Sequence, residues 1–410
     1  MKIKKGLLER IFIDNIFYLF NIAALISAFF YDIRTGAVSA VIILIGIFCY
    51  IYYEKGIRID TAFSLYVFFN LISAIWYLCN GESIWFFFSG ISYNLIPSML
   101  FLVGNSIDRN RFDKIINSIF ISNMFIICIG LFFYLTNKSF YFTVMDTEFA
   151  YTYTYAHKFG SYLTCLVFGS MCVAQIGLLI YRIFQKKNKI ITLISIPIIM
   201  YALLLSMERG AWLASIILLL AVVFVLLKDK KSMFYAIGAV CIISLILVAG
   251  IYFIQNYLNS NVYYYLLDRL GNMNNVFSSR SDQMNKALET FFAYPMGYGL
   301  GAAGNKAALN GGSRIVPDGN YFRILVELGV PGFLSFIYLL MRGIFRGMGK
   351  DFKIRILVAI IIAFAAHASG SNVFDFFYSS YIFWFILGYL SKPQEIITAE
   401  NFEKGAEYLC

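Results

Sequence analysis

Residues 190–227 read IITLISIPIIMYALLLSMERGAWLASIILLLAVVFVLL, an apolar run broken near its middle by Glu208 and Arg209. A helix needs about 20 residues to cross a hydrocarbon layer of about 30 Å, so this run is too long for one crossing. Divided at the charged step, it gives two spans, 190–206 and 210–227. We therefore predict two transmembrane helices that meet at one face of a membrane.

The composition of the whole chain excludes a water-soluble protein. Of its 410 residues, 60% are hydrophobic and 14% are charged, whereas soluble domains contain about 45 to 50% apolar residues. The surface of a soluble protein of this size needs more polar residues than this chain has. Lipid must cover the remainder, so we predict an all-α polytopic membrane protein with one integral membrane domain, residues 1–410.

Apolar runs follow one another along nearly the whole chain, which predicts about twelve transmembrane helices. Their approximate ranges are 11–30, 36–53, 61–80, 85–104, 115–136, 157–181, 190–206, 210–227, 233–254, 320–341, 354–373 and 375–391. The first run follows a basic start but lacks a small-residue cleavage site, so we expect it to remain as a span.

Lys and Arg gather on alternate segments between these spans, for example in residues 109–114 and 228–231. Cytoplasmic loops of membrane proteins carry the excess of basic residues, so both termini are predicted to be cytoplasmic. The net charge of +10 is then explained by membrane orientation, and no nucleic-acid partner is expected.

The largest extracytoplasmic segment in this arrangement is residues 255–319, and a loop of this length is usually functional. Apolar residues recur in it at i, i+3, i+4, i+7 and i+8 from Met284. This spacing predicts a short amphipathic helix at about 281–293, lying on the membrane surface, with Ser279 or Ser281 as its N-cap.

Two arginines on the predicted outer side are candidates for binding an anion. Arg209 begins a span beside Glu208, and Arg280 precedes the surface helix, whose N-terminal amides would add to anion binding. A guanidinium offers five donors in a planar fork that matches phosphate oxygens. For Arg209 the alternative is a side chain that snorkels towards lipid headgroups and pairs with Glu208.

A polar stripe opens the span that follows the large loop. Asn320, Arg323 and Glu327 are spaced i, i+3 and i+7, so they share one face of the predicted helix. Ionisable groups at membrane depth usually mark a binding site or an ion path. Two interpretations stay open, namely substrate binding and a structural Arg323–Glu327 ion pair that fixes helix packing.

The two histidines, His157 and His367, are too few and too far apart to predict a metal site. His367 is expected to be a packed polar residue of its span. No metal and no other cofactor is predicted.

Four sequence features occur in an order that resembles the O-antigen polymerase and O-antigen ligase superfamily. They are Arg209-Gly-Ala-Trp-Leu-Ala at a span start, Arg280 in the large outer loop, Pro295-x-Gly-x-Gly, and Asn320-Tyr-x-x-x-Leu-x-Glu-x-Gly-x-x-Gly. The resemblance is carried by the order and spacing of these features over about residues 200–335.

The resemblance implies a metal-independent, inverting glycosyltransferase of the bacterial cytoplasmic membrane. Its donor would be an undecaprenyl-diphosphate-linked oligosaccharide, and its reaction the polymerisation of repeat units into O-antigen or capsule at the outer face. Arg209 and Arg280 would hold the donor diphosphate, and the turn from Asp318 to Tyr321 would face the acceptor. Ligases of the family carry a His where this chain has Asp318, so its absence favours a polymerase.

In this interpretation Asp318 is the hypothetical general base, with Glu208 and Glu327 as rivals. The predicted site comprises Asp318, Arg209 and Arg280 as catalytic groups and Glu208, Asn320, Tyr321, Arg323 and Glu327 as substrate-binding groups. Expected partners are the lipid-linked oligosaccharide and membrane lipid, with a chain-length regulator as a further candidate.

Two other functions stay open at this point. One is ligase-type transfer of finished polysaccharide to another acceptor. The other is a flippase or other transporter of lipid-linked oligosaccharides, for which twelve spans are ordinary. Transporters commonly contain two related halves, and the sequence shows no internal repeat, which favours an enzyme that works at one membrane face.

Overall fold

The computed structural model describes residues 13–29, 38, 41–48, 58–81, 84–136, 165–185, 189–226, 238, 252, 273–304, 319–375 and 377–393. Within these ranges the regular structure is helical and no β-strand occurs. The helices in chain order are α2 (Ile16–Phe29), α4 (Thr61–Cys79), α5 (Ile84–Gly90), the π-helix η1 (Ile91–Leu95), α6 (Ile96–Ser98), α7 (Leu100–Ser106), α8 (Arg109–Thr136), α11 (Cys165–Phe184), α12 (Lys189–Leu205), α13 (Arg209–Leu226), α16 (Met273–Ala293), α18 (Asn320–Met348), α19 (Phe352–Gly370), the 3-10 helix η2 (Val373–Asp375) and α20 (Phe377–Ser391).

Five of the described helices are long and apolar enough to cross a membrane. They are Thr61–Cys79, Arg109–Phe132, Cys165–Phe184, Asn320–Met348 and Phe352–Gly370. Large apolar side chains point outward from several helices, for example Ile190 at 72% and Leu220 at 63% exposure, as expected where lipid covers the surface. The all-helical membrane class is thus confirmed, whereas the count of twelve spans and the orientation stay predictions.

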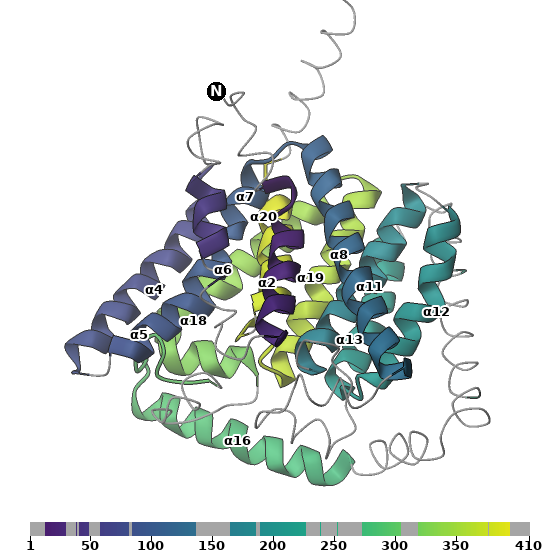
Figure 1. Cartoon of the computed structure of the whole chain (residues 1–410). Helices are drawn as coiled ribbons and strands as arrows, with labels where there is room; N and C mark the ends of the chain where they lie inside the picture. Colours follow the sequence, from purple (N-terminus) through teal and green to yellow (C-terminus); the bar gives the residue numbers. More distant parts are fainter. Residues whose placement is uncertain are drawn as a thin grey trace, which may run out of the picture.

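The helices form an upright bundle in which α19 and α20 lie centrally (Figure 1). Glycines allow the backbones of α7 and α20 to touch: a Cβ on Gly104 would lie 2.1 Å from the Phe385 carbonyl oxygen, and one on Gly388 would lie 2.2 Å from that of Phe101. Small residues at such crossings allow the close van der Waals packing that joins helices in a membrane.

One helix, α16, lies across an end of this bundle (Figure 1). It is amphipathic as predicted: Ala287 is buried against Val326 of α18 and Ala303, while Asn285, Lys286 and Glu289 are exposed. Phe292, the last residue of the predicted apolar face, is instead 71% exposed. The predicted start at Ser279 or Ser281 is wrong, because the helix begins at Met273. No Gly or Pro occurs between 273 and 293, so nothing in the sequence stops the helix from extending beyond its apolar stripe.

Cations cap the C-terminal end of α20, at the α18–α19 connection. Lys350 donates to the Tyr389 carbonyl at 2.6 Å and Arg346 donates to that of Ser391 at 2.6 Å, which complements the negative end of the helix dipole. Burial, together with the nearby charges of Lys392 and Arg346, lowers the pKa of Lys350 to about 7.

Candidate functional site

The predicted break between residues 206 and 210 is confirmed as a tight turn between α12 and α13. Met207 adopts a positive φ of 50°, a conformation that is strained for a non-glycine residue and is often found at functional sites. The Ser206 hydroxyl accepts from the Glu208 amide at 3.3 Å, and the Trp212 indole donates to the Leu203 carbonyl at 2.9 Å. The turn therefore places Arg209 at the first position of α13.

Glu208 and Arg209 differ in their access to solvent. Glu208 is 7% exposed and lies against α11, where a Cβ on Gly169 would be 3.2 Å from the Glu208 Cβ. Arg209 is half-buried, beside the first amides of α13. A guanidinium next to a helix N-terminus is a favourable place for a phosphate group.

The last turn of α19 lies against the start of α13, which carries the candidate donor ligand Arg209, and against Gly319, which belongs to the predicted acceptor-side turn. A Cβ on Gly210 would be 2.8 Å from His367 Nε2 and 3.2 Å from Ser371 Oγ. A Cβ on Gly319 would be 2.5 Å from the Ser369 carbonyl oxygen. The start of α13 and the start of α18 thus meet the same turn.

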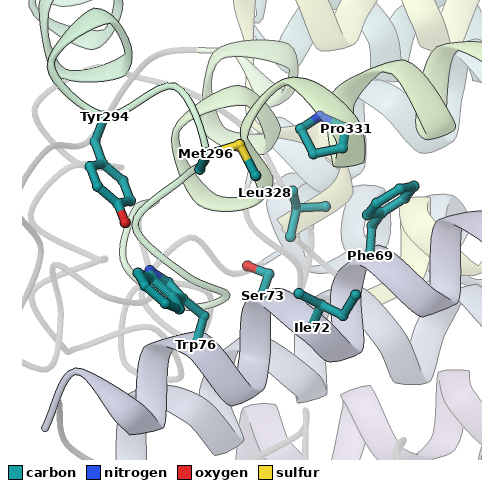
Figure 2. A pocket seen from close by; sticks show the side chains of 8 residues that line it. All are labelled: Phe69, Ile72, Ser73, Trp76, Tyr294, Met296, Leu328 and Pro331. Atoms are coloured by element: carbon teal, nitrogen blue, oxygen red, sulfur yellow. The ribbon is translucent and has the colours of Figure 1, made fainter.

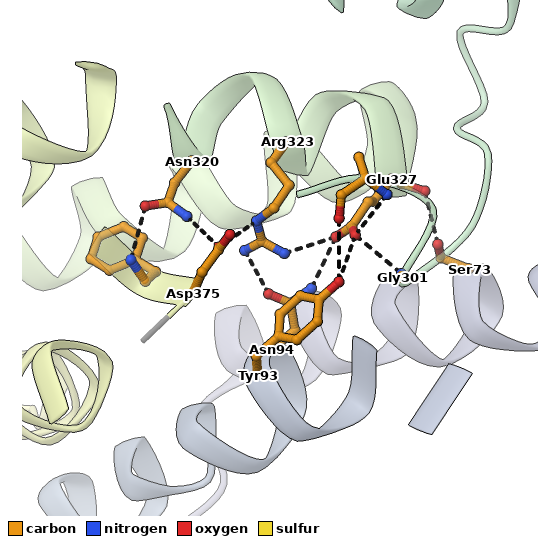
Figure 3. Close-up of polar contacts among 10 residues, drawn as sticks. Ser73, Tyr93, Asn94, Gly301, Asn320, Arg323, Glu327 and Asp375 are labelled. Atoms are coloured by element: carbon orange, nitrogen blue, oxygen red, sulfur yellow. Dashed lines mark hydrogen bonds and ion pairs between the residues drawn. The ribbon is translucent and has the colours of Figure 1, made fainter. Parts of the chain in front are cut away.

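Behind that junction lies a buried polar cluster centred on Arg323, which is 1% exposed (Figure 3). Its Nη1 donates to Glu327 Oε2 at 2.8 Å, and its Nε lies 2.8 Å from Asp375 Oδ1. Its Nη2 donates to Asn94 Oδ1 at 2.7 Å, and its guanidinium lies 5.2 Å from the centre of the Tyr93 ring. One cation therefore joins α18, η1 and η2.

Both carboxylate oxygens of Glu327 accept several hydrogen bonds. Oε1 accepts from the Tyr93 hydroxyl at 3.2 Å and from the amides of Gly301 and Ala303 at 3.1 and 3.3 Å. Oε2 accepts from Asn94 at 3.1 Å as well as from Arg323. Glu327 has no exposed surface, so its position favours the structural role that the sequence left open rather than a general base.

The first residue of α18 joins that helix to η2. Asn320 donates to Asp375 Oδ1 at 2.9 Å and accepts from the Phe374 amide at 2.9 Å. The next residue, Tyr321, donates to the Ala365 carbonyl of α19 at 2.9 Å. These bonds fix the turn at residues 319–321 against the end of α19.

The glycine-rich segment before α18 packs tightly on a break in that helix. Gly329 has φ 64° and ψ −167°, which interrupts α18. The carbonyls there are used by the preceding segment, since the Gly299 amide donates to the Glu327 carbonyl at 3.0 Å. A Cβ on Gly329 would lie 2.3 Å from the Met296 carbonyl carbon, so the Pro295-x-Gly-x-Gly motif serves backbone packing.

The structure brings together some of the predicted site residues and separates others. Asn320, Arg323 and Glu327 belong to one buried cluster, whereas Glu208 and Arg209 lie at the turn between α12 and α13. Arg280 belongs to α16, but its side chain lies outside the described part of the molecule, and Asp318 lies outside it entirely. The roles given to these residues stay predictions.

Sequence reasoning missed Tyr93, Asn94 and Asp375, which complete the buried cluster. Tyr93 and Asn94 lie in a π-helical turn inside the predicted span 85–104, and such turns often occur at functional positions. The available signal was a single Asn within an apolar span, followed by Pro97. Asp375 is the first residue of the predicted span 375–391.

An apolar cavity of about 280 Å³ opens between α4 and the broken part of α18 (Figure 2). Its lining consists of Phe69, Ile72, Ser73, Trp76, Tyr294, Met296, Leu328 and Pro331. The Ser73 hydroxyl donates to the Glu327 carbonyl at 2.9 Å, so the cavity offers a ligand mostly hydrocarbon contacts.

Among the described residues, no group of three or more His, Cys, Asp or Glu side chains is arranged to hold a metal ion.

Residues 190–337 match the family model described as O-Antigen ligase, a range that includes α12, α13, α16 and the first part of α18. This match confirms the predicted resemblance of the chain to the O-antigen ligase and polymerase superfamily. No curated protein matches the chain.

Proposed function

We propose that this protein polymerises undecaprenyl-diphosphate-linked oligosaccharide repeat units into a surface polysaccharide, a proposal supported by the match of residues 190–337 to the family model described as O-Antigen ligase. The match itself supports a membrane enzyme of the O-antigen ligase or polymerase type that acts on lipid-linked saccharide. The polymerase activity, the diphosphate donor and the location at the outer face of the cytoplasmic membrane are the proposal.

The observation that carries this proposal is the meeting of two segments at the last turn of α19. Gly210 contacts His367 and Gly319 contacts Ser369, so the diphosphate candidate Arg209 and the turn next to Asp318 share one neighbour. A glycosyl transfer from a lipid diphosphate requires this proximity, because the donor phosphate and the attacking hydroxyl must lie on two sides of one sugar carbon.

In the proposed reaction, a hydroxyl of the incoming lipid-linked repeat unit attacks the anomeric carbon of the growing chain with inversion. The new carbon–oxygen bond forms as the bond from that carbon to the diphosphate oxygen breaks. The hydroxyl proton passes to Asp318, and undecaprenyl diphosphate leaves. Arg209 and Arg280 stabilise the charge that develops on the leaving group, as preorganised cations do in other enzymes.

Asp318 also bears on the choice between polymerase and ligase. It stands where ligases of the family carry a His, and a carboxylate next to a membrane can act as a base if desolvation raises its pKa.

The second candidate function is ligase-type transfer to another acceptor, which is favoured by the description of the matching family model, O-Antigen ligase.

A gene-deletion strain tests the proposed function in cells. Loss of a polymerase should leave single lipid-linked repeat units that face outward, whereas loss of a ligase should leave finished polymer on its lipid carrier. Repeat units that accumulate facing inward would overturn both functions and indicate a flippase.

Complementation of that strain tests the role of Arg209. We expect Arg209→Ala at normal membrane level to abolish long chains, and Arg209→Lys to restore them only in part, because an ammonium lacks the bidentate fork. Arg342→Ala is the matched control, since Arg342 pairs with Asp60 at the opposite end of α18. Long chains made by Arg209→Ala would rule out the diphosphate role.

A further inference from the structure

His367 occupies a position at the junction that its sequence context did not indicate. It belongs to the last turn of α19 and is 3% exposed. Its imidazole Nε2 and Cδ2 would lie 2.8 and 2.9 Å from a Cβ on Gly210. The ring therefore packs directly on the backbone of the residue that follows Arg209.

The same turn also contacts the other side of the proposed site. A Cβ on Gly319 would lie 2.5 Å from the Ser369 carbonyl oxygen and 3.5 Å from that of Ala368. Gly319 adjoins Asp318 in the chain and has φ 110°, a backbone conformation that favours glycine. Gly319 thus lets the backbone of α19 touch the start of α18, and Gly210 lets the His367 ring lie on the start of α13.

The surrounding contacts hold this turn in place. Tyr321 donates to the Ala365 carbonyl at 2.9 Å, and Asn320 binds both Asp375 and the Phe374 amide. Because the turn is anchored to α18 in this way, the packing of His367 on Gly210 sets where α13 begins relative to α18.

We propose that His367 is a positioning residue for the glycosyl transfer, whose imidazole fixes the separation between Arg209 and the acceptor-side turn at Gly319. This inference rests on the proposed function and names a determinant of the same site. With 3% of its surface exposed, His367 is placed to act on the reaction through Gly210.

The close contact gives a direct perturbation of this separation. A Cβ 2.8 Å from Nε2 is closer than real Cβ contacts come, so Gly210→Ala must displace the imidazole, the start of α13 or both. A displacement of about 1 Å in a catalytic group can lower the rate by about 100-fold. We expect Gly210→Ala to lower kcat by about 10- to 100-fold.

His367→Ala should also lower kcat, by about tenfold, because the start of α13 loses the group it rests on. The double variant Gly210→Ala/His367→Ala should be no slower than His367→Ala, since the added methyl then occupies space vacated by the ring. The matched control is Gly46→Ala, whose Cβ would meet only ordinary contacts at 3.4 Å from Ile13 and Ile16, and it should keep wild-type turnover.

The experiment measures kcat and KM for purified protein in nanodiscs with undecaprenyl-diphosphate-linked repeat units, per folded molecule as judged by gel filtration and thermal midpoint. His367→Asn is a second variant that leaves room for the Gly210 methyl if His367→Ala folds poorly. The inference is supported by lower kcat with KM changed less than about threefold, together with the loss of the Gly210→Ala penalty in either His367 background.

Two results overturn it in distinguishable ways. If the wild type forms polymer and the single variants keep kcat within twofold, or if their penalties multiply in the double variant, His367 does not position the site and the proposed function stands. If the wild type forms no polymer, the proposed function fails and the inference fails with it.

Discussion

Removal of the Arg323 guanidinium tests the structural interpretation of the buried cluster. Arg323→Met keeps a long apolar side chain but leaves Glu327 and Asp375 without the cation that lies 2.8 Å from each. Glu327 keeps its donors from Tyr93, Asn94 and two amides. Asp375 keeps the hydrogen bond from Asn320.

The magnitude follows from the burial of all three groups, none of which is more than 1% exposed. Breaking a buried ion pair by removing one partner typically lowers stability by about 3 to 5 kcal/mol, because it leaves an uncompensated charge. We expect a loss of that size for Arg323→Met. Arg323→Met/Glu327→Gln/Asp375→Asn removes both orphaned charges and should recover at least half of the loss.

The assay is equilibrium unfolding in mixed micelles by titration with SDS, followed by circular dichroism. Arg342→Met is the control, since it breaks a pair with Asp60 in which Arg342 is partly exposed, and such pairs contribute about 0 to 1 kcal/mol. A loss below about 1 kcal/mol for Arg323→Met, or a triple variant no more stable than the single one, would refute the structural role. A stable triple variant with a raised KM would instead support the other interpretation, in which Arg323 binds substrate.

Three further predictions concern the base, the far end of the bundle and a helix crossing. Asp318→Asn should lower polymer elongation by about 100-fold or more in the in vitro assay, and wild-type elongation would make Asp318 only a feature of the turn before α18. The pKa of Lys350 is about 7 in the folded protein and 10.5 ordinarily. Between these two pH values the unfolded chain therefore keeps a proton on Lys350 that the folded protein has lost. Stability should therefore rise with pH from about 7 to 10 and stay level with respect to this group below pH 7, and Lys350→Met should remove this rise in SDS titrations at several pH values. Gly104→Ala puts a methyl 2.1 Å from a backbone oxygen and should lower the free energy of unfolding by at least about 1 to 3 kcal/mol; a change as small as that of Gly46→Ala would contradict the described crossing.

The helical elements were largely predictable because the physical signal for them is local. A run of apolar residues long enough to cross a bilayer specifies a helix whatever its neighbours are. The break before Arg209 was also predictable, because Glu208 and Arg209 interrupt an apolar run, and α13 begins at Arg209 as expected. The amphipathic character of α16 followed from its spacing, although its start did not.

The polar cluster was only half predictable. Asn320, Arg323 and Glu327 share a face through helical spacing alone, and the Arg323–Glu327 pair was one of two stated interpretations. Tyr93, Asn94 and Asp375 come from helices distant in sequence, so periodicity within one segment cannot reveal that they face Arg323.

His367 shows the same limit. It was correctly predicted to be packed, and its burial is confirmed. Its neighbours, however, are decided by Gly210 and Gly319, which lie far away in the chain. A glycine has no side chain, so the sequence pattern gives no signal of these contacts. Only the arrangement of the helices shows that Gly210 and Gly319 lie against α19.

The most direct test of the central claim is the reaction of purified protein in nanodiscs with undecaprenyl-diphosphate-linked repeat units, with EDTA present and products resolved on a gel. The proposed polymerase should give a ladder spaced by one repeat unit for the wild type and for Arg342→Ala, and none for Arg209→Ala. The absence of a wild-type ladder, with substrate crossing liposome membranes instead, would contradict the proposal and indicate a transporter.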